Sequence, residues 1–219
     1  VNSTDRNEAY WAKMRADMGH SAPFELNYLA IGNENWGHAY FDNFAACLKG
    51  VRRYCYKGQP TDLLKLFDVT VVVSAGVDIR PQDSNESWAI INKKYRDMIV
   101  DEHVYHSYQW FIDNSKRYDC YDRSGAKVLL GEYAVHSESD GRGRLNGENS
   151  LRSALAEAAF LTGCERNSDV VSMTCYAPLF ASTLNYRWTP DMIWFNAHET
   201  MLTPNYYVQQ LFAKNVGEY

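Results

Sequence analysis

Five apolar runs separated by helical patterns limit what this sequence can fold into. Two of them, TVVVSAG and KVLLG, are apolar almost without interruption, which is typical of parallel strands that helices cover. The five predicted strands span residues 24–34, 67–76, 96–106, 126–135 and 169–179. Strands that alternate with helices along a chain predict an α/β fold with a parallel sheet.

Amphipathic patterns lie between and around these runs. They predict helices at residues 5–19, 40–58, 86–98, 113–125, 148–163 and 203–215. The polar stretch 136–150 is expected to form a long surface loop. No internal repeat or interdomain linker stands out, so the 219 residues are expected to form one domain.

Charge and cysteine content exclude some classes of protein. The net charge is -5 and the 22 Lys and Arg residues are scattered, whereas nucleic-acid binding needs clustered positive charge, so no nucleic-acid partner is expected. No apolar run approaches the roughly 20 residues of a membrane helix, so no membrane partner is expected either. The cysteines lack paired CxxC spacing and are expected to be buried free thiols: Cys47, Cys55, Cys120, Cys164 and Cys175.

Polar side chains gather at the carboxyl end of nearly every predicted strand. Asn33 and Glu34 end the first strand, and Glu132 ends the fourth. The third strand carries Asp101, Glu102, His103 and Tyr105. In a parallel β/α barrel these ends point into one shared pocket, where active sites of the fold are built. Glu34 and Glu132 are therefore predicted to face each other.

Paired carboxylates are what glycoside hydrolysis needs. One protonates the leaving oxygen, and the other attacks the sugar or activates water. Taken singly, Glu34 and Glu132 could each equally be a surface residue in an ion pair. Their joint occurrence at strand ends, each followed by aromatic residues, favours the catalytic interpretation.

Five segments in order carry a family resemblance: AIGNENWG, DEHVYHSYQWF, RYDCYDRSGAKVLLGEYAVH, DVVSMTCYAPLFA and WTPDMIWFNAHETMLTPNYYVQQLFAKN. Between roughly residues 24 and 217 the sequence resembles glycoside hydrolase family 51 α-L-arabinofuranosidases. The resemblance implies a partial TIM (β/α)8 barrel with strands four to eight. Residues 1–219 would then be an incomplete catalytic domain, a fragment or truncated product that lacks the amino-terminal barrel units and the family's β-sandwich.

The resemblance also implies roles for individual residues. Glu34 matches the general acid/base, and Glu132 matches the nucleophile. Asn33 matches the residue that hydrogen-bonds the sugar 2-hydroxyl. His103 and Tyr105 match a pair that lines the pocket near the nucleophile, and Tyr105 would donate a hydrogen bond to the nucleophile's carboxylate.

Several aromatic residues are further substrate-binding candidates. Trp36 could form an apolar wall that keeps the acid protonated. Tyr176 could line the pocket from the end of the last strand. Trp188 and Trp194 could form a platform for the sugar, although core packing is an equally good interpretation of both.

A metal site is the alternative for the third strand. His103 and His106 are three residues apart, beside Asp101 and Glu102. The glycosidase interpretation already accounts for His103, so we assign no metal and no cofactor.

The expected function is that of a retaining α-L-arabinofuranosidase that releases L-arabinose from non-reducing ends of plant oligo- or polysaccharides such as arabinan and arabinoxylan. A non-catalytic carbohydrate-binding fragment and a related glycosidase acting on a pyranoside remain the alternatives. An arabinose-containing carbohydrate is the expected partner, and a homo-oligomer is conceivable. The sequence leaves the compartment open, with a secreted or periplasmic setting favoured over a cytoplasmic one.

Overall fold

The centre of the protein is a parallel five-stranded sheet with the strand order β1-β4-β5-β6-β7. The computed structural model describes residues 6–22, 24–77, 80–136 and 147–216. The strands are β1 (Tyr28–Ile31), β4 (Thr70–Ser74), β5 (Ile99–His106), β6 (Lys127–Val135) and β7 (Val171–Tyr176). Each lies within one of the five predicted runs, so the predicted α/β fold with a parallel sheet is confirmed.

The sheet is open within the described residues, because β1 and β7 each have only one neighbour. Its strands follow one another in sequence order, and every neighbouring pair is parallel. Sequential parallel strands linked by helices are the building plan of a β/α barrel. The arrangement is therefore part of a barrel, as the sequence predicted.

All but one of the predicted helices are confirmed. The helices are α1 (Arg6–Asp17), α2 (Gly37–Arg52), α3 (Leu63–Leu66), α4 (Glu86–Lys94), α5 (Tyr108–Asp113), α6 (Leu151–Arg166) and α7 (Pro204–Lys214). The prediction for 113–125 is wrong, because that stretch holds only a 3-10 turn, η1 (Arg117–Cys120). The predicted loop at 136–150 lies largely outside the described residues.

Several helices start where a side chain satisfies the free backbone N–H groups of the first turn. The Asn85 side chain accepts hydrogen bonds at the start of α4. Ser150 and Ser153 form a reciprocal capping box at the start of α6. Thr203 caps α7, whose first residue is Pro204.

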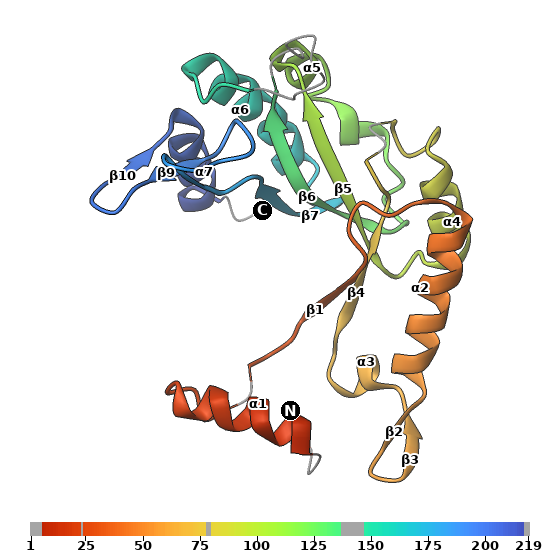
Figure 1. Ribbon diagram of the computed structural model, residues 1–219. Helices are drawn as coiled ribbons and strands as arrows, with labels where there is room; N and C mark the ends of the chain where they lie inside the picture. The colour runs from red at the N-terminus through yellow and green to blue at the C-terminus, as the bar shows by residue number, and fades with distance from the viewer. Residues whose placement is uncertain (1–5, 23, 78–79, 137–146, 217–219) are drawn as a thin grey trace.

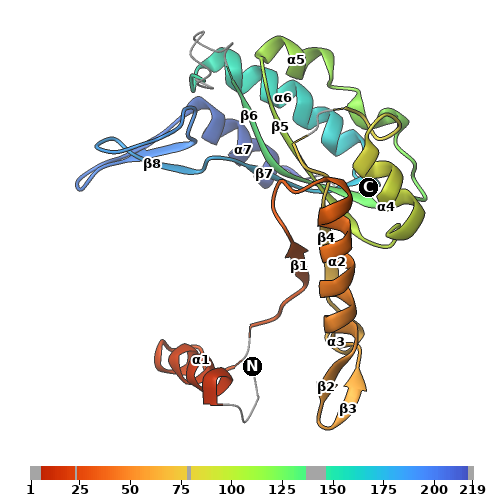
Figure 2. The same cartoon turned by 45° about the vertical axis from the view of Figure 1, so that its right-hand side comes forward.

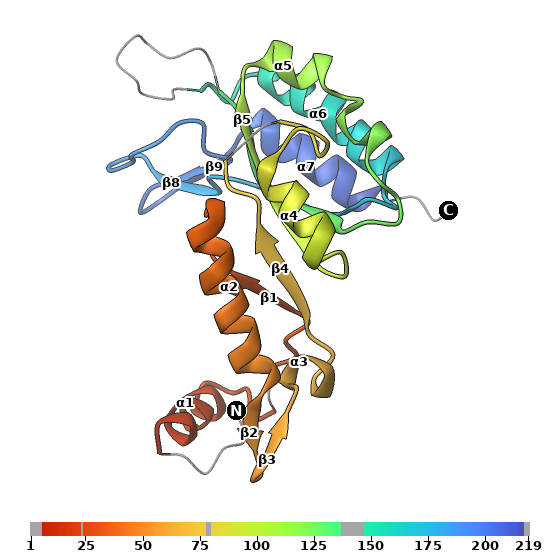
Figure 3. The ribbon, with the colours of Figure 1, turned by 90° about the vertical axis from the view of Figure 1, so that its right-hand side faces the viewer.

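Two short β structures escaped the sequence analysis. The predicted helix at 40–58 ends at Arg52, and a hairpin follows, formed by β2 (Tyr54–Tyr56) and β3 (Gln59–Thr61). Its turn residues, Lys57 and Gly58, both have positive φ angles, as tight hairpin turns require. Figure 3 shows α2 alongside β1 and β4, with the hairpin near its carboxyl end.

The second missed structure is a three-stranded sheet of order β10-β9-β8. Its strands are β8 (Phe180–Ser182), β9 (Ile193–Phe195) and β10 (Thr200–Leu202). In Figures 1 and 2 it reaches away from the main sheet.

The hydrophobic core lies between the main sheet and the helices that cover one of its faces (Figures 1 and 2). Strand residues that point to this face, such as Val100 and Leu130, are fully buried. They form one cluster with helix residues, among them Phe44, Trp88 and Phe160. Because successive strand residues point to opposite faces, Asp101, His103 and Tyr105 on β5 point to the other face.

A buried carboxylate ties β5 to the helical layer. Glu102, whose side chain is 4% exposed, accepts a hydrogen bond from Trp88 Nε1 at 2.8 Å. It also pairs with the Arg117 guanidinium at 3.3 Å. Two tyrosine hydroxyls, those of Tyr118 and Tyr121, donate to it as well. A buried charge needs such partners, because removal from water strongly disfavours an unpaired ion.

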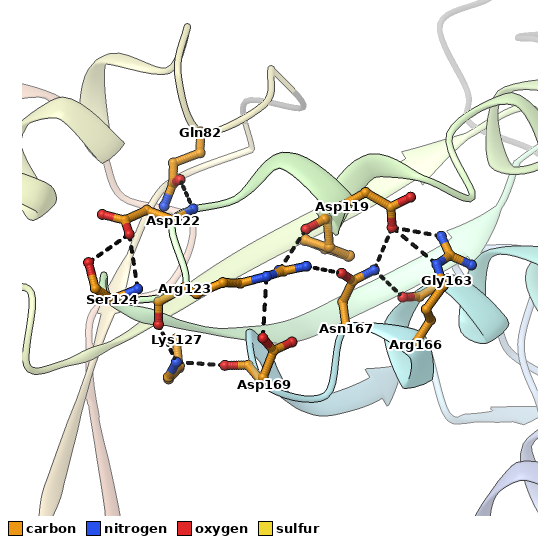
Figure 4. A network of polar contacts seen from close by, with 11 residues as sticks. Gln82, Asp119, Asp122, Arg123, Ser124, Lys127, Gly163, Arg166, Asn167 and Asp169 are labelled. Atoms are coloured by element: carbon orange, nitrogen blue, oxygen red, sulfur yellow. Dashed lines mark hydrogen bonds and ion pairs between the residues drawn. The ribbon is translucent and has the colours of Figure 1, made fainter.

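A second polar network joins the loops at the amino-terminal ends of β6 and β7 (Figure 4). Arg123 donates to Asn167 and pairs with Asp169. Asn167 in turn donates to Asp119 at 2.8 Å. These contacts fasten the segment before β6 to the segment before β7. In barrel proteins this end contributes stability, whereas the other end carries the active site.

The cysteine expectation is half right. All five cysteines are free, but only Cys164 is buried. The other four lie on exposed strand, helix and turn positions, although neighbouring atoms cover part of Cys175. No helix in the described part of the chain is long and apolar enough to cross a membrane.

We predict that Glu102→Ala destabilises the protein by about 3 to 5 kcal/mol, because it takes the carboxylate away from the buried Arg117 guanidinium. The free energy of unfolding in urea measures this effect. Glu165→Ala, at an exposed position on α6, is the control and should change it by less than about 0.5 kcal/mol. A loss below about 1 kcal/mol for Glu102→Ala would contradict the importance of this network.

Candidate active site

Glu34 lies in a strained turn directly after β1. The turn has positive φ angles at Gly32 (96°), Glu34 (54°) and Gly37 (78°). Glycine adopts such angles freely, whereas a residue with a side chain does so at a cost of about 1 to 3 kcal/mol. Strain of this kind persists where the surrounding structure imposes it, and it is common at functional sites.

Contacts on both sides hold this turn. The backbone N–H of Asn33 donates to Asn35 Oδ1 at 2.9 Å. Tyr40 on α2 donates its hydroxyl proton to the carbonyl of Ile31 at 2.7 Å and accepts from the backbone N–H of Ser74 at 2.9 Å. The turn is thus anchored to the ends of β1 and β4.

Glu132 reaches the same side of the sheet through a bulge in β6. Glu102 is paired with Leu130, but the next residue of β5, His103, is paired with Glu132. Gly131 is therefore an extra residue on β6. A bulge of this kind changes which side chains face which side of a sheet, so Glu132 faces His103 while Tyr133 remains in the core.

Only glycine fits at the bulge. A Cβ atom on Gly131 would overlap Oδ1 of Asp101. The Asp101 carboxylate thus occupies the space that any side chain at position 131 would need. The bulge and the position of Asp101 depend on each other.

His103 joins the two glutamates. Its Nδ1 atom lies 3.0 Å from Glu34 Oε1 and 3.5 Å from Glu132 Oε2. An oxygen of Glu34 and an oxygen of Glu132 lie within 4.8 Å of each other. The predicted meeting of the two carboxylates at the strand ends is present in the structure.

Tyr105 holds the Glu132 carboxylate. Its hydroxyl donates to Glu132 Oε2 at 2.6 Å, which is the hydrogen bond expected from the sequence. Burial, followed by this hydrogen bond, raises the pKa of Tyr105, so the hydroxyl remains a donor at neutral pH. The ring of His136 packs against Tyr105 with 4.8 Å between centroids, and burial lowers the pKa of His136 to about 4.

The His103 ring is positively charged at neutral pH. Burial alone would lower its pKa, but hydrogen bonds to Asp101 and Glu34 and the nearby negative charges raise it to about 9. Its Nε2 atom lies 3.1 Å from Asp101 Oδ2. An imidazolium among three carboxylates offsets part of their mutual repulsion.

The same three side chains could be arranged around a cation. Glu34, His103 and Glu132 each offer one ligand atom within 4.8 Å of the others. Both His103 nitrogens already lie at hydrogen-bond distance from carboxylate oxygens, at 3.0 Å from Glu34 and 3.1 Å from Asp101. Hydrogen bonding thus accounts for the arrangement, and we assign no metal to this cluster.

Two further predicted residues, Asn33 and Trp36, lie in the turn that carries Glu34. Asn33 is exposed beside Glu34. Trp36 packs its Cβ against Gly76, and its side chain is largely open at 64% exposure. Both belong to the turn that carries Glu34, so they border the site.

The other three candidates make their contacts away from the two carboxylates in the described part of the chain. Tyr176 is buried beside Tyr133 and accepts a hydrogen bond from Asn149. Trp194 lies in β9 and donates to the same Asn149. Trp188 is 63% exposed in the segment between β8 and β9.

Three features of the site escaped the sequence analysis. Asp101 was noted at a strand end without a role, although its spacing of two from His103 places both on one face. The packing of the His136 ring against Tyr105 had no sequence signal. The bulge at Gly131 had only a weak one, a glycine inside a strand pattern.

A β/α sheet that carries two acidic side chains at the carboxyl ends of its strands, one of them held by a tyrosine, is typical of barrel glycoside hydrolases. Comparison with known proteins agrees with this class. Residues 2–123 match the family model "Alpha-L-arabinofuranosidase 1 domain", and residues 131–219 match "Alpha-L-arabinofuranosidase C-terminal domain". The chain belongs to the family 51 α-L-arabinofuranosidases.

Curated relatives include an extracellular exo-α-L-arabinofuranosidase of Streptomyces chartreusis, 42% identical over 95% of this chain and 22% of that protein. α-L-Arabinofuranosidase 1 of Arabidopsis thaliana is 36% identical over 94% of this chain and 26% of its own length. The chain thus spans about a quarter of the length of these relatives.

Solved structures show the same fold. An arabinose-bound GH51 α-L-arabinofuranosidase superposes with a TM-score of 0.67 and 30% identity, over 93% of this chain and 30% of that one. The α-L-arabinofuranosidase of Thermotoga maritima, in an arabinose complex, has a TM-score of 0.60 at 20% identity, over 100% of this chain and 45% of that one. The likeness supports a partial TIM barrel.

We predict that Gly131→Ala displaces Asp101 and lowers the free energy of unfolding by about 1 to 3 kcal/mol, because the added methyl group has no room. The matched control is Gly50→Ala in α2, where nothing lies within 4 Å of an added Cβ. It should raise stability by up to about 1 kcal/mol, because alanine favours a helix over glycine. Equal effects in urea unfolding would show that the bulge tolerates a side chain.

Proposed function

We propose that this chain carries the catalytic pair of a retaining α-L-arabinofuranosidase that releases L-arabinose from the non-reducing ends of arabinose-containing oligo- or polysaccharides. The observation that carries the proposal is the cluster of Glu34, His103, Tyr105 and Glu132 at the strand ends. Exo action is also named for the Streptomyces relative.

Glu34 is the general acid and base of the proposed mechanism, and Glu132 is the nucleophile. Glu34 protonates the departing alcohol while Glu132 attacks the anomeric carbon and forms a covalent arabinosyl-enzyme. Glu34 then takes a proton from water, which attacks the intermediate and frees arabinose. The hydrogen bond from Tyr105 keeps the Glu132 carboxylate oriented for attack.

The separation of the carboxylates supports retention. Retaining glycosidases hold these groups about 5 Å apart, whereas inverting enzymes need about 6.5 to 9.5 Å to admit a water molecule. One oxygen of Glu34 and one of Glu132 lie within 4.8 Å of each other, which is compatible with the shorter, retaining separation.

The rest of the site belongs to the proposal as well. Asn33 hydrogen-bonds the sugar 2-hydroxyl, and Trp36 borders the sugar from the same turn.

Residues 1–219 form one incomplete catalytic barrel domain, and the remaining barrel units and a β-sandwich lie outside this sequence. The continuity of the main sheet between the two matched segments supports one domain, because β5 and β6 pair across their boundary.

A second candidate function is carbohydrate binding without catalysis. The main sheet is open at β1 and β7 within the described residues, so the pocket around the two glutamates is not enclosed by a closed barrel, which favours this candidate for the chain alone. Binding of an arabino-oligosaccharide without release of arabinose would identify this function.

The catalytic roles are tested with two alanine variants and an aryl arabinofuranoside, in this chain and in a protein completed with the other barrel units. Glu132→Ala should lower turnover by about 10⁴-fold or more, because no group replaces the nucleophile. Glu34→Ala should still form the intermediate from this substrate, since a good leaving group needs little protonation. Its slow step is then the attack of water on the intermediate.

Added azide separates the two roles. Azide needs no general base, so it should restore turnover of Glu34→Ala and yield an arabinosyl azide of retained configuration. Glu86→Ala is the control, because this side chain is 72% exposed, and it should keep full activity. A retained azide product from Glu132→Ala alone would reverse the assignment, and full activity of either alanine variant would remove that residue from the mechanism.

A further inference from the structure

Asp101 is the one carboxylate of this cluster to which the mechanism assigns no role. It lies on β5, two residues before His103, and is buried. Its Oδ2 atom lies 3.1 Å from His103 Nε2. Its Oδ1 atom has no hydrogen-bond partner among the described residues and rests against Gly131.

Asp101 and Glu34 bind opposite nitrogens of one ring. His103 Nε2 faces Asp101, and Nδ1 faces Glu34 at 3.0 Å and Glu132 at 3.5 Å. An imidazole can donate from both nitrogens only when it is doubly protonated. The His103 side chain is 3% exposed, so water does not compete for either nitrogen.

We propose that Asp101 is a positioning residue that holds His103 oriented and doubly protonated, so that Nδ1–H faces both Glu34 and Glu132. The roles of these two glutamates in the inference rest on the proposed function. The carboxylate of Asp101 touches neither of them and acts through the histidine ring.

The position of Nδ1–H suits a reaction in which negative charge moves between two carboxylates. The proposed mechanism needs Glu132 as the attacking carboxylate and Glu34 as the proton donor in the first step. In the arabinosyl-enzyme Glu132 is an ester, and Glu34 has given its proton to the leaving alcohol. Nδ1–H lies within reach of the ionised carboxylate at both stages, so one fixed donor serves both steps.

Two further ionisable groups near the ring, Tyr40 and Cys175, keep their protons at pH 7. The ionisable side chains around His103 and Asp101 come from several elements: Asp101 and Tyr105 on β5, Glu34 after β1, Glu132 on β6, Tyr40 on α2 and Cys175 on β7. Burial, with a smaller effect of the Asp101 charge, raises the pKa of Tyr40 to about 12 and also raises that of Cys175. Both therefore keep their protons at neutral pH.

The test is the titration of His103 by NMR in the intact chain with ¹⁵N-labelled histidine. In the unaltered protein both ring nitrogens should carry protons at pH 8. Asp101→Asn should lower the pKa of His103 by about 1 to 3 units, because it removes an opposite charge at hydrogen-bond distance but keeps the shape of the side chain. Asp97→Asn, at an exposed position just before β5, is the matched control and should leave the titration unchanged.

Two results would overturn the inference. One is a singly protonated His103 ring in the unaltered protein at pH 8, which needs no variant at all. The other is an unchanged His103 pKa in a folded Asp101→Asn variant. Turnover of an aryl arabinofuranoside tests the proposed function separately, so absence of activity with the expected titration would count against the enzyme and not against the role of Asp101.

The pH dependence of stability gives a further prediction. The pKa of His103 is raised from 6.5 to about 9 in the folded state, so its stabilising contribution is fully present below about pH 6.5 and is lost as the pH rises through about 9. The Tm of the unaltered protein should therefore fall more steeply between pH 6.5 and 9.5 than the Tm of Asp101→Asn. If the Tm values of the two proteins changed in parallel with pH, the protonation of His103 would not contribute to stability through Asp101.

Discussion

The contact between the Asp101 carboxylate and Gly131 is the constraint on which the end of the sheet that carries Glu34 and Glu132 depends. It requires a residue without a side chain at position 131, and that residue is the one that β6 carries in excess over β5. The shift in register places Glu132 opposite His103 while Tyr133 stays in the core. A regular β6 would instead turn Glu132 toward the helices, where its charge would be buried without a partner.

Charge balance is the second condition that the site meets. Three carboxylates close together would repel one another, and each would be harder to ionise. The imidazolium of His103 contacts all three. On the opposite face of β5, the negative charge of Glu102 is balanced by the Arg117 guanidinium and by neutral hydrogen-bond donors such as Trp88. Two adjacent acidic residues of one strand thus stay buried because each has its own set of partners.

The sequence predicted the main sheet because its strands are long apolar runs, and it predicted the bond from Tyr105 to Glu132 because both residues belong to segments with a clear family resemblance. It did not predict β2, β3, β8, β9 and β10, since three-residue strands have no periodicity to detect. The bulge was missed because register depends on contacts between strands, such as that of Asp101 with Gly131. The sequence also did not predict that Tyr176 packs against Tyr133 and bonds to Asn149, because these neighbours come from distant segments of the chain.

The two family models meet between residues 123 and 131, and this boundary separates the two glutamates. Glu34 lies in the first matched segment and Glu132 in the second, and the pairing of β5 with β6 joins them. A cut in the connecting segment would leave neither piece with both glutamates. Under the proposed function, hydrolysis would then report that the two pieces have reassembled, which makes this strand pair a natural division for a split-enzyme sensor.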